Sequence, residues 1–190
     1  MSYHNPLHAS VTNNASYALT NANPRSAYCR IPVPHIPFQP ASKWKSSVGR
    51  VSVGTTTFDF AGHPGLGVKI REVASRGAHG VAAMMAGAHD PVLANTGLRS
   101  IQFAITWPGY PHVEWLRSIE IVTPSGHITR SQLAALISQQ YMRFIENISS
   151  SQFAQWRIGH PGLGLEHLVL MSVTNVLDDV WQATIAIERS

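Results

Sequence analysis

The sequence predicts an α+β fold: a mainly antiparallel sheet with one long amphipathic helix packed across it and short accessory helices. Three observations lead to this prediction. Several short stretches alternate apolar and polar residues, as half-buried strands do. One stretch after Thr129 repeats its apolar residues at spacings of three and four, as a helix does. The strands outnumber the helices and do not alternate with them regularly, which favours the α+β class.

The long helix is expected to begin at Thr129, whose hydroxyl can cap the first turn. Gln132, three residues later, can reach back to the Thr129 backbone and complete a capping box. The apolar stripe that follows consists of Leu133, Leu136, Ile137, Tyr141, Phe144, Ile145 and Ile148. Such a stripe must cover a sheet. Shorter helices are expected over 70–75 and 78–87, with Gly77 between them.

Strands are predicted where apolar, β-branched or aromatic residues recur at every second position. Residues 101–105 and 118–122 are expected to be antiparallel neighbours joined by the loop WPGYPH at 107–112. A last strand covers 181–187, after a turn at Asp178 and Asp179. Further strands are expected over 153–158 and 165–173, with some helix possible over 166–170, and a hairpin or bent strand pair over 48–60.

The beginning of the chain differs in composition from the rest. Residues 1–47 form a Pro-, Asn- and Ser-rich basic leader that is expected to be disordered to extended, and 48–190 a single α+β domain. Residues 31–40 read IPVPHIPFQP, in which the prolines exclude a helix interior and a central strand. The apolar residues between these prolines favour a polyproline-like strap that lies along a groove of the domain.

The positive charge of the chain lies in the same leader. Residues 1–50 contain no acidic side chain and five basic ones: Arg25, Arg30, Lys43, Lys45 and Arg50. A basic leader on a near-neutral domain can attract nucleic acid through charge alone. Nucleic-acid binding through these five residues is therefore one possible function, although many linkers carry as much charge for solubility.

Several functional classes are excluded or disfavoured. No apolar run is long enough to span a membrane and the start lacks a secretory signal, so the chain is expected in the cytoplasm or nucleus, without a membrane partner. The single cysteine, Cys29, excludes an intrachain disulfide and a thiolate zinc site. Serine-hydrolase elbows, phosphate loops, dinucleotide loops and the HExxH motif are absent, so neither catalytic residues nor cofactors are expected.

One hexapeptide, GHPGLG, occurs at 62–67 and again at 159–164. Its prolines and glycines predict two similar tight turns, each leading into a secondary element. The functional alternative is that His63 and His160 face each other and, with a carboxylate, hold the metal of a small metal-dependent hydrolase.

The loop after the strand at 101–105 gathers aromatic side chains. Trp107 and Tyr110 are separated by prolines and a glycine, and Trp115 follows with His112 and Arg117 nearby. Exposed aromatic and arginine side chains are typical anchors of protein-binding surfaces. We therefore name these five residues as candidate binding residues. The structural alternative is that the loop folds over the end of the sheet and fills the core.

The motifs DPVL at 90–93, ITWPGYPHVEW at 105–115, ITRSQLAALI at 128–137, RFIE at 143–146 and VLDDVWQATIAI near the end carry a resemblance. Together they resemble an uncharacterised family of basidiomycete fungal proteins, a domain of unknown function with WPGY and ITRxQLA motifs. The resemblance covers about half the chain. It implies an intracellular α+β domain after a variable Pro-rich leader, and it transfers no activity and no catalytic residue.

The leading functional hypothesis is a non-enzymatic binding or scaffold protein. Its aromatic loop and Pro-rich strap would contact a protein partner or a second copy of the chain, as a homo-oligomer. The metal-dependent hydrolase and the nucleic-acid-binding leader are the alternatives.

Overall fold

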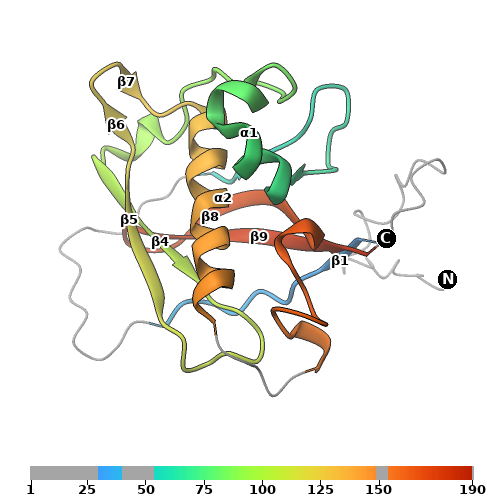
Figure 1. Cartoon of the computed structure of the whole chain (residues 1–190). Coiled ribbons are helices and arrows are strands. Elements are labelled where there is room, and N and C mark those ends of the chain that lie inside the picture. Colours follow the sequence, from blue (N-terminus) through green and yellow to red (C-terminus); the bar gives the residue numbers. More distant parts are fainter. Residues whose placement is uncertain (1–29, 40–53, 149–153, 190) are drawn as a thin grey trace, which may run out of the picture.

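A large sheet and two helices form the part of the chain described by this computed structural model, residues 30–39, 54–148 and 154–189 (Figure 1). The sheet order is β2 (Thr56–Thr57), β8 (Leu168–Leu177), β9 (Val180–Glu188), β4 (Ser100–Ile105) and β5 (Trp115–Glu120), while β1 (Arg30–Pro32) also pairs with β9 and β3 (Val68–Lys69) with β8. Every pairing in this sheet is antiparallel except the one between β4 and β9. The predicted mixed class with a mainly antiparallel sheet is confirmed.

The hairpin of β8 and β9 lies in the middle of the sheet. Trp181, Ile185 and Ile187 belong to the core, because alternate side chains of a strand share one face. The turn contains Asp178 with a φ of 45°, and the Asn175 side chain donates to its carbonyl at 2.7 Å. This confirms the predicted turn and the predicted last strand.

β4 has different neighbours on its two sides. It pairs with β5 in antiparallel fashion, with Ile101 opposite Ile119, as predicted. On its other side it runs parallel to β9 only as far as the pair of Ala104 and Gln182. Beyond that point β9 pairs instead with β1, from Pro32 opposite Ala186 to Arg30 opposite Glu188. A segment of the leader therefore completes the sheet.

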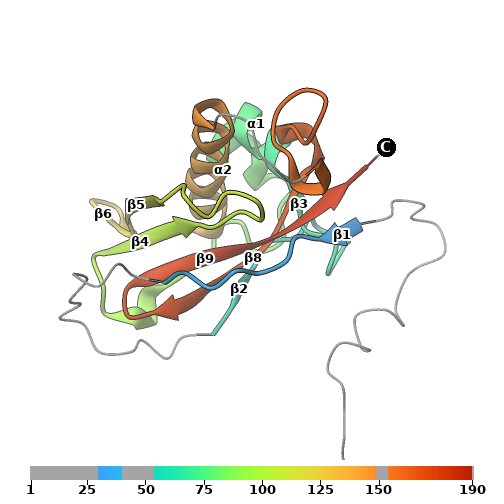
Figure 2. The same ribbon diagram turned by 90° about the horizontal axis from the view of Figure 1, so that it is seen from below.

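The two helices, α1 (Ile70–Ala82) and α2 (Arg130–Asn147), lie on the same face of the sheet (Figure 2). α2 begins as predicted: Thr129 accepts a hydrogen bond from the Gln132 backbone and the Gln132 side chain accepts one from the Thr129 backbone. Gly77, with φ 65° and ψ 179°, interrupts α1 and separates two helical segments as predicted, but the second segment ends at Ala82 and not at residue 87. Neither helix, among the residues described, has the length and apolarity needed to cross a membrane.

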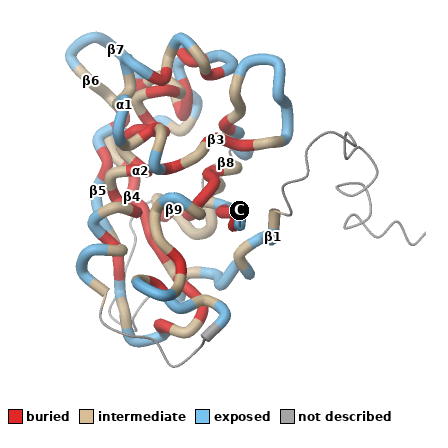
Figure 3. Tube along the Cα trace, turned by 45° about the vertical axis from the view of Figure 1, so that its right-hand side comes forward, coloured by how far each residue is buried: buried red, intermediate tan, exposed pale blue. Residues whose placement is uncertain are grey.

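The core lies between the helices and the sheet. Figure 3 shows buried residues along α2 and the inner strands of the sheet. The largest side chains with almost no exposed surface include Trp181, Tyr110, Phe58, Phe103 and Phe144. Tyr141 and Phe144 of α2 are in contact at right-angled ring geometry, with centroids 6.4 Å apart and planes at 80°.

One strand prediction is wrong, and one lies partly outside the described residues. The strand expected over 153–158 is a short 3-10 helix, η2 (Ala154–Trp156), followed by an isolated bridge at Ile158; residue 153 lies outside the described part. Long-range packing overrides the local pattern there. The first half of the hairpin or bent strand pair expected over 48–60 lies outside the described residues, and in its second half β2 pairs with the distant β8.

Candidate functional site

Residues 30–39, which we call the strap, lie along the part of β9 that β4 leaves open. After β1, the Val33 N–H donates to the Ile185 carbonyl at 2.9 Å. Figure 2 shows the strap in blue running beside β9. The predicted docked strap is confirmed, and this part of the leader belongs to the folded domain.

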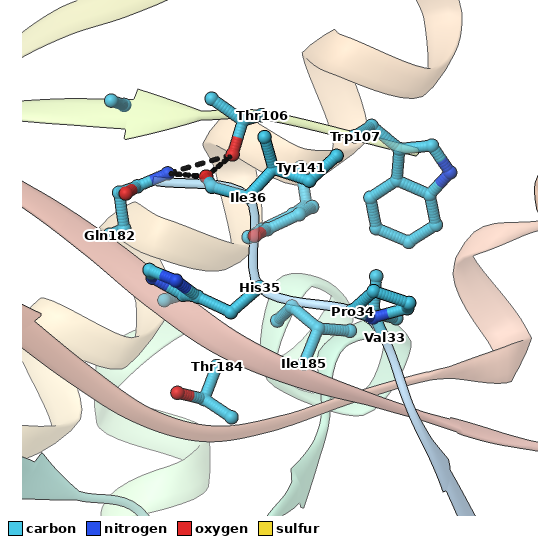
Figure 4. Close-up of a pocket in the computed structure, with 12 residues that line it drawn as sticks. Val33, Pro34, His35, Ile36, Thr106, Trp107, Tyr141, Gln182, Thr184 and Ile185 are labelled. Carbon is cyan, nitrogen blue, oxygen red and sulfur yellow. Dashed lines mark hydrogen bonds between the residues drawn. The ribbon is translucent and has the colours of Figure 1, made fainter. Parts of the chain in front are cut away.

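Gln182 holds the middle of the strap (Figure 4). Its side chain is only 4% exposed; its oxygen accepts from the Phe38 N–H at 2.9 Å, and its amide donates to the Ile36 carbonyl at 3.1 Å and to the Thr106 hydroxyl at 2.8 Å. Buried polar groups are stable only when they are hydrogen-bonded. Two of the three partners belong to the strap, so the strap and Gln182 depend on each other.

The space beneath the strap is too small for a ligand. It is a cavity of about 20 Å³ between the strap, β4, β9 and α2, which is room for about one water molecule. Tyr141 of α2 lies on its inner side, and burial raises the pKa of the Tyr141 hydroxyl far above its ordinary value. The strap therefore fills its own groove and can meet other molecules only with its outer side.

An ion-pair cluster fixes the beginning of the strap. Arg30 donates to one oxygen of Glu188 at 2.8 Å, and Lys69 of β3 pairs with the other oxygen at 2.6 Å. Burial acts to raise the pKa of Glu188, but the hydrogen bonds and charges of Lys69 and Arg30 outweigh it and the pKa is lowered. Glu188 is 6% exposed, so it is a buried carboxylate held in its ionised form by two cations from different segments.

The five candidate binding residues of the aromatic loop and the start of β5 differ in how far they are exposed. Trp107, Tyr110 and Trp115 are 3%, 2% and 8% exposed, so they cannot be surface anchors. Trp107 donates to the Trp156 carbonyl at 2.9 Å, and the Tyr110 hydroxyl accepts from the Ile158 N–H at 2.9 Å. His112 and Arg117 are exposed.

The reason for this correction lies in α2. Phe144 contacts the rings of Trp107 and Trp115, with centroids 6.3 Å and 5.6 Å away. The tryptophans thus fill the core, as the structural alternative expected, and they do so by packing against α2. The guanidinium of Arg117 lies 4.4 Å from the centroid of the Trp115 ring and covers its outer side.

The alternative function as a metal-dependent hydrolase requires a set of metal ligands around His63 and His160. Figure 1 shows the two hexapeptide turns apart, one above and one below the end of the sheet near the C mark. His63 and His160 are both exposed, and His63 bonds locally to the Ala61 carbonyl at 3.0 Å. Within the described residues, no group of three or more His, Cys, Asp or Glu side chains could hold a metal ion. The predicted pairing of these histidines is therefore wrong.

The two identical hexapeptides adopt different conformations. In the first, Gly62, Gly65 and Gly67 have positive φ; in the second, only Gly159 does, and the bond between His160 and Pro161 is cis. The prediction of two similar turns is wrong, because each turn follows its own neighbours. Gly67 is required by close packing: an added Cβ would lie 2.7 Å from the Leu170 carbonyl oxygen.

The segments that follow the two hexapeptides meet in one place, which we call the charged cleft. It is a cleft of about 430 Å³ between α1 and η3 (Leu165–His167), with the ends of β3 and β9 at its base. Its lining consists only of charged or polar residues: Lys69, Arg71, Glu72, Ser75, Arg76, Glu166, His167 and Glu188. Lys69 and Glu166 hold the same position after each hexapeptide, with opposite charges.

Only one of the five basic residues named in the leader lies among the residues that the structure describes. Arg25, Lys43, Lys45 and Arg50 lie outside the described residues. Arg30 lies inside them, and its charge is engaged by Glu188. Nucleic-acid binding by the leader stays a prediction, and Arg30 is not a free contributor to it.

Comparisons with protein-family models, with curated proteins and with solved structures found no match for this chain. The fold and the two sites are therefore interpreted from their own geometry. The resemblance to the fungal family stays a prediction.

Sequence reasoning found the strap and missed the charged cleft. Glu188 and Gln182 looked like ordinary polar positions of an alternating strand, because a period of two does not show which outward residue another segment covers. The cleft had one usable signal. Each hexapeptide is followed by an apolar residue and then a charged one, Lys69 or Glu166, so the repeat marks the two segments that line the cleft without showing that they meet.

Proposed function

We propose that this chain is a non-enzymatic protein-binding module, cytoplasmic or nuclear, that presents the outer side of its strap to a protein partner. One observation carries the proposal: the large hydrophobic side chains that the described residues expose, Ile31 at 38% and Ile36 at 42%, both belong to the strap. Exposed apolar side chains that gather on one segment mark interaction sites, whereas single ones scattered over a surface do not.

The strap is held in a form suited to recognition. Its inner backbone groups are bonded to β9 and Gln182, so it need not be ordered when a partner binds. In this proposal α2 acts as the one long amphipathic helix that backs the sheet behind the strap, so the presenting surface is rigid.

The chemistry of the strap favours one kind of partner. Pro34 and Pro37 are exposed and separated by two residues, with the exposed Ile36 between them. Extended Pro-rich segments with this spacing dock into grooves lined by aromatic side chains. We therefore assign as the partner a protein with such a groove.

The test places a photo-crosslinking amino acid at Ile36 of the full chain and, as a control, at the exposed His127 of β7 (Gly126–His127). A protein that crosslinks only from position 36 is purified, and its Kd is measured for the wild type and for the Ile31→Ser, Ile36→Ser double variant. We expect the double variant to bind at least about tenfold more weakly, the effect of removing buried apolar anchors.

A matched control is Leu116→Ser, an apolar-to-serine change on β5, which should leave the Kd unchanged. Equal binding by the double variant would contradict the proposal, as would equal crosslinking from position 127. Sedimentation of the purified chain covers the remaining case: self-association that disappears in the double variant would make a second copy the occupant and overturn the aromatic-groove assignment.

A further inference from the structure

The charged cleft contains charges that the protein itself satisfies and charges that it does not. Glu188 is paired with Lys69 and Arg30, and Glu72 is paired with Arg76 at 3.1 Å. These ion pairs neutralise two of the three carboxylates that line the cleft.

Two opposite charges are left over. Arg71 forms no ion pair with any residue that the structure describes, and it stands on the α1 side of the cleft. Glu166 lies on the η3 side of the cleft. Its nearest basic side chain among the described residues is His167, with Glu166 Oε1 and His167 Nδ1 3.8 Å apart. That Nδ1 accepts the Gly164 N–H at 2.9 Å and so carries no proton in this arrangement, which leaves Glu166 without a donor there.

The Glu166 carboxylate lies close to the second hexapeptide. An added Cβ on Gly164 would lie 2.5 Å from both Glu166 carboxylate oxygens, so the side chain folds back over this glycine. Glu166 on η3 and Arg71 on α1 line the same cleft, and each belongs to the segment that follows one of the two hexapeptides.

We propose that the charged cleft binds a small zwitterion, a free amino acid or a short peptide, whose carboxylate pairs with Arg71 and whose ammonium group pairs with Glu166. A ligand with both signs satisfies both leftover charges without adding net charge to the cleft. The volume of about 430 Å³ lies in the range of small-molecule sites. Ser75 and the Nε2 of His167 offer further hydrogen-bonding groups on the two sides.

A simple anion is a poorer fit. Arg71, Lys69 and Arg76 would attract it, but two of these cations are already paired with carboxylates of the same cleft. Glu166 would also repel it. This inference does not rest on the proposed function, since it uses a different surface and a different class of ligand.

The test is an NMR titration of the full-length ¹⁵N-labelled chain, followed at the backbone amides of Arg71 and Glu166. The probes are L-alanine, L-alanyl-L-alanine, its N-acetyl form, its C-terminal amide and inorganic phosphate. We expect saturable binding of alanine or dialanine, with each capped dipeptide about fivefold weaker than the free one, the effect of losing one partly exposed ion pair. Alanine and dialanine then separate the amino acid from the peptide.

Two variants make the test specific. Arg71→Gln should remove the difference between dialanine and its amide only, and Glu166→Gln the difference between dialanine and its acetylated form only. Arg143→Gln and Glu146→Gln on the exposed side of α2 are the matched controls and should change neither difference. The proposal is overturned if no zwitterionic probe saturates, if phosphate binds as tightly as dialanine, or if the capped forms bind as well as the free one.

Discussion

The two oxygens of the Glu188 carboxylate hold cations from segments far apart in the sequence. Arg30 belongs to the strap and Lys69 to the strand before α1, and both lie within 2.8 Å of an oxygen of Glu188. A carboxylate that is 6% exposed loses most of its contact with water, so these two partners must replace it. This single residue joins the strap to the charged cleft.

Glu188 should make the stability of the protein depend on acid pH. Its folded-state pKa is lowered, so its stabilisation is complete above the unfolded-state pKa and is lost as pH falls through the folded-state pKa. We expect urea unfolding to show wild type more stable than Glu188→Gln by about 1–3 kcal/mol at pH 7, the usual worth of hydrogen bonds to a charged group.

The difference between the two proteins should shrink as pH falls below about 4.3, the ordinary pKa of a glutamate. Glu120→Gln, an exposed carboxylate on β5, serves as the control and should follow the wild type. A gap between wild type and Glu188→Gln that stays constant from pH 7 to acid would show that the charge of Glu188 contributes nothing.

At the scale of elements, α2 depends on its capping box. The Thr129 backbone N–H donates to the Gln132 side chain at 2.9 Å, and the Thr129 hydroxyl accepts from the Gln132 backbone at 3.4 Å. We expect Thr129→Ala to lower the free energy of unfolding by about 1 kcal/mol, because the Gln132 backbone N–H loses its acceptor.

Urea unfolding of Thr129→Ala and Thr129→Ser measures this effect. Serine keeps the hydroxyl and should retain most of the stability, whereas equal losses for both variants would point to the packing of the threonine methyl group instead.

The start of α2, the break at Gly77, the neighbouring strands 101–105 and 118–122, and the turn at Asp178 could be predicted from the sequence. They could be predicted because caps, turns and periods depend on residues close in the chain. The parallel pairing of β4 with β9 could not be predicted, because the two strands lie far apart in the sequence. The alternation of residues within a strand does not show which other strand it pairs with.

The same distinction between local and distant residues decides which candidate sites could be predicted. The strap was predictable because its prolines and apolar residues alternate locally. The burial of Trp107 was not, because it depends on Phe144, a residue of another element. The charged cleft depends on η3 lying beside α1. The sequence showed the repeated hexapeptide, but it did not show that the segments after the two copies line one cleft.

For the molecule as a whole, the strap should be part of the cooperative unit. We expect a chain beginning at residue 30 to unfold at the same urea concentration as the full chain, because the leader before the strap is predicted to be disordered to extended. A chain beginning at residue 40 should lose on the order of 3 kcal/mol, because Gln182 loses two partners and Val33 its burial.

Equal stability of the two shortened chains would show that the strap adds nothing to the domain. A loss already present in the chain beginning at residue 30 would instead show that the preceding residues contribute to folding.

The position of β9 has a consequence for synthesis on the ribosome. This strand pairs with β8, β4 and β1, and each of these partners precedes it in the chain. Until it leaves the exit tunnel, each of its three partners has an unpaired edge, and the core lacks Trp181, Ile185 and Ile187. The nascent chain therefore exposes hydrophobic surface and unpaired strand edges until β9 has been synthesised. Chains in this state bind chaperones and are prone to aggregate.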